Sequence, residues 1–281
     1  FDGVHIGHQA LLTACAHLAQ QSGCAAGVVT FSEHPDTLVL GKTPVLINTV
    51  TQRQRLLMGY GISQIKVIPF DKKLMNMSWQ DFLAQLMQEG AGGFVCGDDF
   101  RFGFGGQGNA RLLAEFCRQH QLPFAVVSAQ RLDGIDVSST HIRKLLESGE
   151  MEQAVRFLGH AHVMDGTVVA GQQLGRTIGV PTANLILPEG VVVPRFGVYA
   201  CKAIVEGKEY LAVTNIGTRP TVKGQGITVE AWLLDFDGDL YGKTLTLLFY
   251  AFLRPEQKFD YLEQLQVQIQ KDARKVRDFF G

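Results

Sequence analysis

The sequence has few of the features that mark a membrane protein or a nucleic-acid-binding protein. No apolar run reaches the roughly 20 residues that a bilayer-spanning helix needs. The 26 Lys and Arg residues are balanced by 27 Asp and Glu residues, whereas proteins that bind nucleic acid usually carry a basic excess. We therefore expect neither a membrane nor a nucleic acid as a partner.

Cysteine is also scarce. The five cysteines are widely spaced and form no Cys-x-x-Cys pair, which argues against a disulfide framework and against a zinc site. This usage fits the reducing cytoplasm, and we expect all five thiols to be buried packing residues. Their positions are Cys15, Cys24, Cys96, Cys117 and Cys201.

The chain of 281 residues exceeds what one average domain needs and favours two domains. We place residues 1–160 in the first domain and residues 161–281 in the second, where the pattern of helices and strands changes. The printed sequence opens with Phe1 rather than Met, and we expect a β-strand before it, in the middle of the first domain's sheet. The sequence carries no signal for an oligomeric state.

The first domain alternates helix-like and strand-like segments. Short apolar runs are typical of buried parallel strands, and Ser78 is placed to cap an amphipathic helix. Repeated strand–helix units predict a doubly wound parallel sheet with right-handed crossovers. The predicted helices span 7–21, 51–59, 78–89 and 110–120, and the predicted strands span 24–31, 65–70, 94–96 and 124–128.

In the second domain, strands follow one another directly. Turn residues such as Glu206-Gly207-Lys208 separate them, which predicts a small antiparallel β-barrel. Pro255 suits the first turn of a final helix with apolar residues every three or four positions, and we expect this helix to cover the barrel. The predicted strands span 162–170, 198–206, 209–215, 228–235 and 244–252.

The first candidate site begins with His5 and His8, which flank Gly7 at the start of a predicted helix. The pattern resembles the HxGH signature of nucleotidylyltransferases. Both imidazoles would lie on one face of the helix N-terminus, where free backbone N–H groups favour a phosphate. Such donors could stabilise charge on the α-phosphate of ATP as pyrophosphate leaves. The alternative is an incidental pair, because four-residue patterns recur by chance.

Residues 136–143, with the sequence DVSSTHIR, add a second element. Their hydroxyl groups can cap a helix that begins near His141, and Arg143 lies on its first turn. Hydroxyls, backbone amides and a guanidinium together would grip a triphosphate. The alternative is an ordinary Ser/Thr cap followed by a solvated arginine.

The loop of residues 95–103 follows a predicted strand, and ligands of open α/β sheets bind beyond the carboxyl ends of strands. Phe100 or Phe102 could pack on an aromatic ring, and Asp99 could accept hydrogen bonds from ring N–H groups. The plain structural alternative is a loop with a buried aromatic anchor. Residues 30–35, with the sequence TFSEHP, also end a strand and could line the same crevice.

The second candidate site begins in residues 166–185, which carry three spaced glycines and the sequence PTAN. Glycines let a backbone approach phosphates closely, and the amides of the loop become donors. Thr182 and Asn184 offer neutral oxygen ligands that suit Mg²⁺ held jointly with ATP phosphates. A glycine-rich connection between barrel strands would explain the glycines but not the PTAN sequence. The three glycines are Gly171, Gly175 and Gly179.

Glu230 lies inside an apolar predicted strand, after the NIGTRPT segment of residues 215–221. Strand interiors disfavour a lone carboxylate unless it has a role or a partner. A general base fits this position, because it would take the proton from a primary hydroxyl that attacks the γ-phosphate. The alternative is that Glu230 points outward, which strand alternation readily allows.

Together these motifs resemble a known enzyme family. The segments FDGVHIGHQALL, TFSEHP, GDDFRFG and VSSTHIR resemble, in order and spacing, the N-terminal half of bacterial bifunctional riboflavin kinase/FMN adenylyltransferases, or FAD synthetases. The glycine motif with PTAN, NIGTRPT, the strand with Glu230 and DLYG resemble their riboflavin kinase half. The likeness spans nearly the whole chain. Where many members read Glu-x-His, this chain has Trp232 in place of the histidine.

The resemblance implies two ATP-dependent reactions, in which the barrel phosphorylates riboflavin to FMN and the α/β domain adenylylates FMN to FAD. It implies contacts with Mg²⁺ and ATP for Thr182 and Asn184, and general-base duty on the ribityl hydroxyl for Glu230. Two alternatives stay open. One is a riboflavin kinase with an inactive adenylyltransferase half, and the other is a non-catalytic flavin-binding regulator.

Each candidate residue receives an expected role, with riboflavin, FMN and ATP as the only expected partners. The expected catalytic residues are His5, His8, Arg143 and Glu230. The expected ATP-binding residues are Asp2, Gly3, His5, His8, Ser139, Thr140, Arg143, Gly171, Gly175, Gly179 and Thr182. The expected flavin-binding residues are Asp99, Phe100, Arg101, Asn215 and Arg219, and the expected metal ligands are Thr182 and Asn184.

Overall fold

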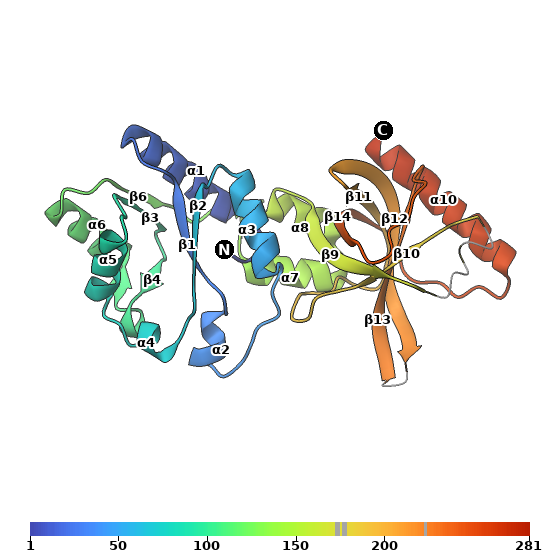
Figure 1. Cartoon of the computed structure of the whole chain (residues 1–281), viewed down its shortest axis with the longest axis horizontal. Coiled ribbons are helices and arrows are strands. Elements are labelled where there is room, and N and C mark those ends of the chain that lie inside the picture. Colours follow the sequence, from blue (N-terminus) through green and yellow to red (C-terminus); the bar gives the residue numbers. More distant parts are fainter. Residues whose placement is uncertain (172–174, 176–178, 222–223) are drawn as a thin grey trace. The chain divides into compact units, whose positions relative to one another are not determined.

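The computed structural model describes residues 1–171, 175, 179–221 and 224–281, and leaves out the side chains of residues 219–221, 224 and 225. The chain folds into two compact units (Figure 1). The first unit consists of Phe1–Leu46 and Val50–Ser139, and the second of Ile47–Thr49 and Thr140–Gly281. The domain boundary after residue 160 remains a prediction.

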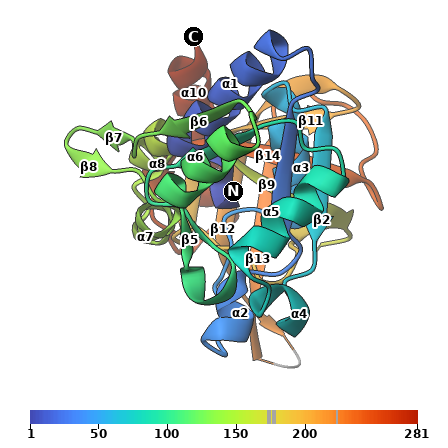
Figure 2. The ribbon, with the colours of Figure 1, turned by 90° about the vertical axis from the view of Figure 1, so that its left-hand side faces the viewer.

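The first unit is a parallel α/β structure, as predicted. β1 pairs in parallel with β2, β3 pairs in parallel with β6, and α1 and α6 both pack against β3 and β6. Figure 2 shows this unit with α5 and α6 toward the viewer. Its helices are η1 (Asp2–Val4), α1 (Ile6–Gln21), α2 (Pro35–Val39), α3 (Val50–Gly59), α4 (Lys72–Met75), α5 (Trp79–Gln88), η2 (Phe104–Gly106) and α6 (Ala110–Gln119). Its strands are β1 (Gly27–Phe31), β2 (Gln64–Ile68), β3 (Phe94–Gly97), β4 (Arg101–Phe102), β5 (Gly108–Asn109), β6 (Phe124–Val127), β7 (Arg131–Leu132) and β8 (Ile135–Asp136).

Local chemistry explains where these helices begin. The hydroxyl of Ser78 accepts a hydrogen bond from the backbone N–H of Asp81 at 3.0 Å, which confirms the predicted cap of α5. Asn109 caps α6 in the same way, through the N–H of Leu112. The apolar stripe of each helix then packs against β3 and β6, in a core that includes Leu83 and Phe116.

The second unit contains a closed six-stranded antiparallel barrel with the strand order β10-β13-β12-β11-β14-β9. Closure gives every strand two hydrogen-bonded neighbours, which leaves no open sheet edge. Its strands are β9 (His162–Val169), β10 (Ala183–Ile186), β11 (Gly197–Val205), β12 (Lys208–Thr221), β13 (Gly224–Leu233) and β14 (Thr244–Arg254). Its helices include α7 (Ser139–Ser148), α8 (Met151–Leu158) and α10 (Leu262–Phe280).

Some details differ from the predictions. β10 and α8 were not predicted, and α10 begins at Leu262, well after Pro255, which therefore does not lie in its first turn. Helix α7 begins at Ser139 rather than near His141. All five cysteines are free, but Cys15 is only half-buried and Cys24 is exposed, because Cys24 follows the turn that ends α1.

Helix α10 covers part of the outer face of the barrel, as predicted. Ala273 and Val276 are buried in a cluster with outward-facing barrel residues such as Val198, Val213 and Trp232. Trp232, which replaces the family's histidine, therefore has a packing role under this helix. None of the described helices is long and apolar enough to cross a membrane.

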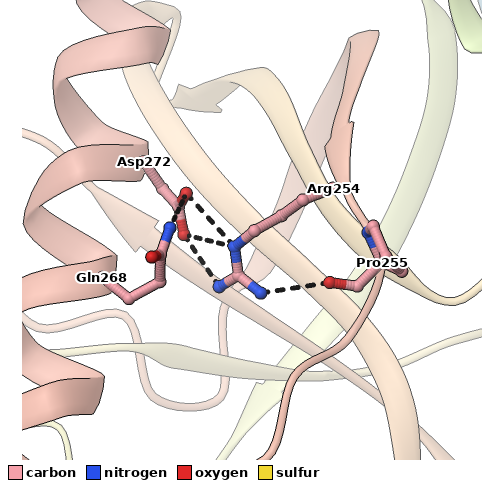
Figure 3. A network of polar contacts seen from close by, with 4 residues as sticks. All are labelled: Arg254, Pro255, Gln268 and Asp272. Carbon is pink, nitrogen blue, oxygen red and sulfur yellow. Dashed lines mark hydrogen bonds and ion pairs between the residues drawn. The ribbon is translucent and has the colours of Figure 1, made fainter.

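A buried ion pair ties α10 to the barrel (Figure 3). Arg254, at the end of β14, donates from Nε and Nη2 to the carboxylate of Asp272 at 2.9 and 2.8 Å. Gln268 donates to the same carboxylate at 2.9 Å, and Arg254 also donates to the carbonyl oxygen of Pro255 at 3.1 Å. The Asp272 side chain is 1% exposed, so its charge depends on these partners.

We predict that Asp272→Asn lowers the free energy of unfolding by about 3–5 kcal/mol, because breaking a buried pair leaves the Arg254 charge uncompensated. The matched control is Asp235→Asn, which breaks the exposed pair between Asp235 and Arg277 of the same helix. Asp235 has a positive φ of 59°, which asparagine tolerates. Urea unfolding should show a large loss for the first variant and almost none for the second, and equal losses would contradict the prediction.

Candidate active sites

The first site forms where η1 turns into α1. Gly3 and Val4 have positive φ angles of 83° and 41°, and this tight turn places His5 at the N-cap of α1. The Nδ1 atom of His5 accepts a hydrogen bond from the backbone N–H of His8 at 3.3 Å. The two imidazole rings stack with their centroids 3.6 Å apart. The structure thus brings the two predicted histidines together at a helix N-terminus.

Gly7 leaves room for the His5 ring between the two histidines. A Cβ atom at this position would lie 3.2 Å from Nδ1 of His5, which is tighter than ordinary van der Waals contact. The side chains of Asp2 and His5 beside it are buried, at 6% and 7% exposure. The HxGH spacing therefore has a steric reason in this fold, in addition to any chemical one.

His8 is held neutral. Its Nδ1 atom is buried and has no hydrogen-bond partner among the described residues. Burial lowers the pKa of His8 well below its usual range, and the positive charges of neighbouring groups, including His5 and Arg53, lower it further. An incoming anion would offset both effects, which suits a site for a phosphate.

Arg53 is a residue of this site that sequence reasoning missed. Its side chain on α3 is buried at 7% exposure, and its Nη2 atom donates to the backbone oxygen of Phe31 at 2.8 Å. Phe31 ends β1, and the carboxyl ends of parallel strands are where ligands of such sheets bind. The sequence offered one indication that Arg53 is buried. It lies four residues before Leu57, so both residues share one face of α3, and Leu57 is fully buried.

The DVSSTHIR segment is divided between the two units. The Ser139 hydroxyl donates to the backbone oxygen of Asp2 at 2.8 Å, which ties the end of the first unit to η1. This contact joins two predicted ATP-binding residues. Thr140 and Arg143 lie on α7 in the second unit, and their roles with ATP stay predictions.

In the loop after β3, one aromatic residue is a buried anchor and another is exposed, so both interpretations of this loop apply. Phe102 is the buried anchor at 8% exposure, whereas Phe100 is 43% exposed and stacks on it with the ring centroids 5.3 Å apart. Asp99 lies close to the backbone at Gly97, and Arg101 is exposed. An open aromatic face beyond the carboxyl end of β3 is suited to a planar ring.

The second site is a row of polar residues across three barrel strands. Asn184 on β10 pairs directly with Glu230 on β13, which in turn pairs with Asn215 on β12. Directly opposed residues share one face of a sheet, with Cβ atoms roughly 4.5–5.5 Å apart. The structure therefore brings together three residues that were predicted from separate motifs.

This row lies on the outer face of the barrel. Val229 and Ala231, which flank Glu230, are 1% and 0% exposed and point to the interior. Glu230 is only half-buried, and the row continues to Val198, which packs in the outer cluster with α10. Glu230 thus points outward, as the plain alternative held, but between two amide side chains.

Within the glycine-rich segment, Gly171 packs directly against Asn184 of this row. A Cβ atom at Gly171 would overlap the side chain of Asn184, with Cγ only 2.6 Å away. A Cβ atom at Gly175 would collide with the backbone oxygen of Val180 and lie 3.5 Å from Oγ1 of Thr182. Both glycines are needed for this close approach, which explains them without reference to phosphate.

Two further predicted residues receive less support. Gly179 has a positive φ of 72° and no described atom within 4 Å of a Cβ placed there, so its role with ATP stays a prediction. The Arg219 side chain lies outside the described residues.

Sequence reasoning missed Glu256, whose carboxylate lies against Gly217, two positions along β12 from Asn215.

Paired histidines at a helix N-terminus and a polar row on a closed barrel give one chain two candidate sites, which is the class of a two-site enzyme. Comparison with known proteins names the family. The FAD synthetase family model matches residues 1–141, and the riboflavin kinase model matches residues 158–280. The chain belongs to the bifunctional riboflavin kinase/FMN adenylyltransferase family.

Individual relatives agree with this assignment. Bifunctional riboflavin kinase/FMN adenylyltransferases from Listeria monocytogenes and Escherichia coli are 34% and 35% identical, over 100% of this chain and 90% and 91% of theirs. A solved structure described as a macrolide-efflux protein from Streptococcus pneumoniae has a TM-score of 0.87 at 29% identity, over 99% of this chain and 91% of that chain. These likenesses extend over both units.

We predict that Gly171→Ala lowers FMN formation about tenfold or more, because the new methyl group displaces Asn184 from the row. FAD formation from supplied FMN should not change. The control is Gly59→Ala, a helical glycine with open space around it. Initial rates of both reactions, separated by chromatography, check the prediction, and normal FMN formation by Gly171→Ala would contradict it.

Proposed function

We propose that this chain makes FAD from riboflavin in two ATP-dependent transfers, with FMN formation at the barrel row and FAD formation at the paired histidines. Family membership supports both activities. The observation that carries the residue assignment is the register of Asn184, Glu230 and Asn215, which puts one carboxylate between two amides on an open face. The free cysteines are consistent with a cytoplasmic enzyme that acts on small molecules.

In the kinase reaction, the primary hydroxyl of the ribityl chain attacks the γ-phosphorus of ATP. A new P–O bond forms, the bond from that phosphorus to the β,γ-bridging oxygen breaks, and ADP leaves. Glu230 accepts the hydroxyl proton as general base. Asn184 and Asn215 flank it on neighbouring strands, and Asn215 would orient the flavin substrate through its amide.

The donor set fits Mg²⁺ held jointly with phosphates. Thr182 and Asn184 offer neutral oxygens, which Mg²⁺ accepts when substrate phosphates complete its coordination. Among the described residues, no group of three or more His, Cys, Asp or Glu side chains could hold a metal by itself. When bound, Mg²⁺ would neutralise charge on the transferred phosphoryl group.

In the adenylylation reaction, a phosphate oxygen of FMN attacks the α-phosphorus of ATP, the bond to the α,β-bridging oxygen breaks, and pyrophosphate leaves. His5 and His8 would donate hydrogen bonds to the α-phosphate as its charge grows, at the N-terminus of α1. Asp2, Gly3 and Ser139, which lie in the same unit as the histidines, are proposed to hold the rest of the triphosphate. The exposed ring of Phe100, with Asp99 and Arg101, is proposed to bind the flavin.

Incubation of the protein with riboflavin, ATP and Mg²⁺ tests the function as a whole. Chromatography should show FMN followed by FAD, with ADP and pyrophosphate as the other products. FMN without FAD would indicate a kinase with an inactive adenylyltransferase half. Tight flavin binding without ATP consumption would indicate a non-catalytic regulator.

We predict that Glu230→Gln abolishes FMN formation, because glutamine cannot accept the hydroxyl proton, and leaves adenylylation of supplied FMN intact. Glu209→Gln on β12 is the matched control, because this exposed carboxylate pairs with Lys202. The two reactions are measured separately on each variant. Equal loss of both activities in Glu230→Gln would refute the role of this residue.

We predict that His8→Ala lowers FAD formation by roughly 100-fold, the usual effect of losing one transition-state donor, and spares the kinase reaction. His17→Ala serves as the control, since His17 is exposed on the same helix. Steady-state rates with saturating FMN and ATP provide the comparison. FAD output at the wild-type level in His8→Ala would rule out the proposed role.

A further inference from the structure

Helix α10 closes one side of the polar row on the barrel. Val213 lies two positions before Asn215 on β12, and it pairs with Trp232, which lies two positions after Glu230 on β13. Both side chains pack in the apolar cluster under α10. A substrate whose hydroxyl reaches Glu230 cannot extend in this direction along the face, because packed side chains already fill the space.

The other side of the row is built differently. Gly217 lies two positions after Asn215 on β12 and pairs with Thr228 on β13. Ile186 lies two positions after Asn184 on β10, and this apolar side chain is 62% exposed. Alternate positions of a strand share one face, so these residues continue the outer face that carries the row. The body of a substrate held at the row therefore extends over this side.

The carboxylate of Glu256 lies on this second side. A Cβ atom at Gly217 would lie only 2.7 Å from Cδ of Glu256 and 3.2 Å from Oε2, so the carboxylate takes the place of a side chain there. Glu256 is exposed, and it has no hydrogen-bond or ion-pair partner among the described residues. Its acceptor oxygens are therefore available to a ligand.

The ion pair under α10 holds the backbone that leads to Glu256 (Figure 3). Arg254 donates to the carboxylate of Asp272 and to the carbonyl oxygen of Pro255, the residue just before Glu256. A backbone that is ordered in advance loses less freedom when its side chain binds a ligand. The position of Glu256 beside the row is thus set by the fold of the second unit.

We propose that Glu256 is a specificity-determining residue of the kinase reaction, whose carboxylate accepts hydrogen bonds from the secondary hydroxyls of the ribityl chain. This inference rests on the proposed role of Glu230 at the terminal hydroxyl. Gly217 and Asn215 are about 7 Å apart along an antiparallel strand, and the secondary hydroxyls of an extended ribityl chain lie within this span of the terminal one. Because hydrogen bonds to a charged acceptor are stronger than neutral ones, Glu256 favours a polyol chain over an apolar chain.

The test compares riboflavin with an analogue that carries a hydroxypentyl chain, which keeps the terminal hydroxyl and lacks the secondary ones. Steady-state FMN formation, or formation of the phosphorylated analogue, gives KM and kcat at saturating ATP. Glu256→Ala should raise the KM for riboflavin about tenfold, with kcat and the KM for the analogue nearly unchanged. Glu263→Ala is the control and should change neither KM, because Glu263 is an exposed carboxylate in the first turn of α10.

Each other result has a distinct meaning. A wild-type protein that forms no FMN would refute the proposed function. Three results in Glu256→Ala would overturn the inference alone: an unchanged KM for riboflavin, a fall in kcat alone, or an equal rise in the KM of both substrates. If Glu256→Ala does not fold by circular dichroism, Glu256→Gln decides, because it keeps the side-chain length and removes the charge. A rise in KM for riboflavin alone then supports the inference, and any other pattern overturns it.

Discussion

The pairing register of β10, β13 and β12 is the constraint on which the second site depends. Strand residues alternate between two faces, so Asn184, Glu230 and Asn215 share the outer face only in the observed register. A slip of one residue would turn Glu230 into the interior and expose Ala231. Because closure gives each strand two neighbours, the barrel itself holds this row, and no loop is needed to position it.

The first site depends on different physics. A tight turn, a helix N-terminus and a small number of buried charges place His5 and His8 together, and the cost of burial keeps His8 neutral. Its chemistry therefore follows from desolvation and local charge, whereas the barrel row follows from backbone geometry. The two candidate sites, each proposed to bind a triphosphate, thus depend on unrelated structural means.

Local patterns predicted most of the fold but few of the long-range relations. Amphipathic spacing and caps gave the bounds of α1, α3, α5 and α6 to within one or two residues, since these depend on neighbours along the chain. β10 was missed because it is short and overlaps the PTAN motif, which was interpreted as a loop that binds ATP and Mg²⁺. The sequence suggested Asn184, Asn215 and Glu230 one by one as candidates, but their pairing depends on strands far apart in sequence. Arg53 was missed because a lone arginine in an amphipathic helix looks like a solvated one.

The bond between Arg254 and Asp272 has a consequence for the behaviour of the barrel in different solvents. Mobile ions screen exposed charges over roughly 10 Å at 0.1 M salt but reach buried pairs poorly. The contribution of this buried pair to the attachment of α10 therefore changes little with ionic strength, whereas the exposed pair of Arg277 and Asp235 weakens as salt rises. At high salt, α10 is therefore held to the barrel through Arg254 even where its contact with Asp235 is weakened.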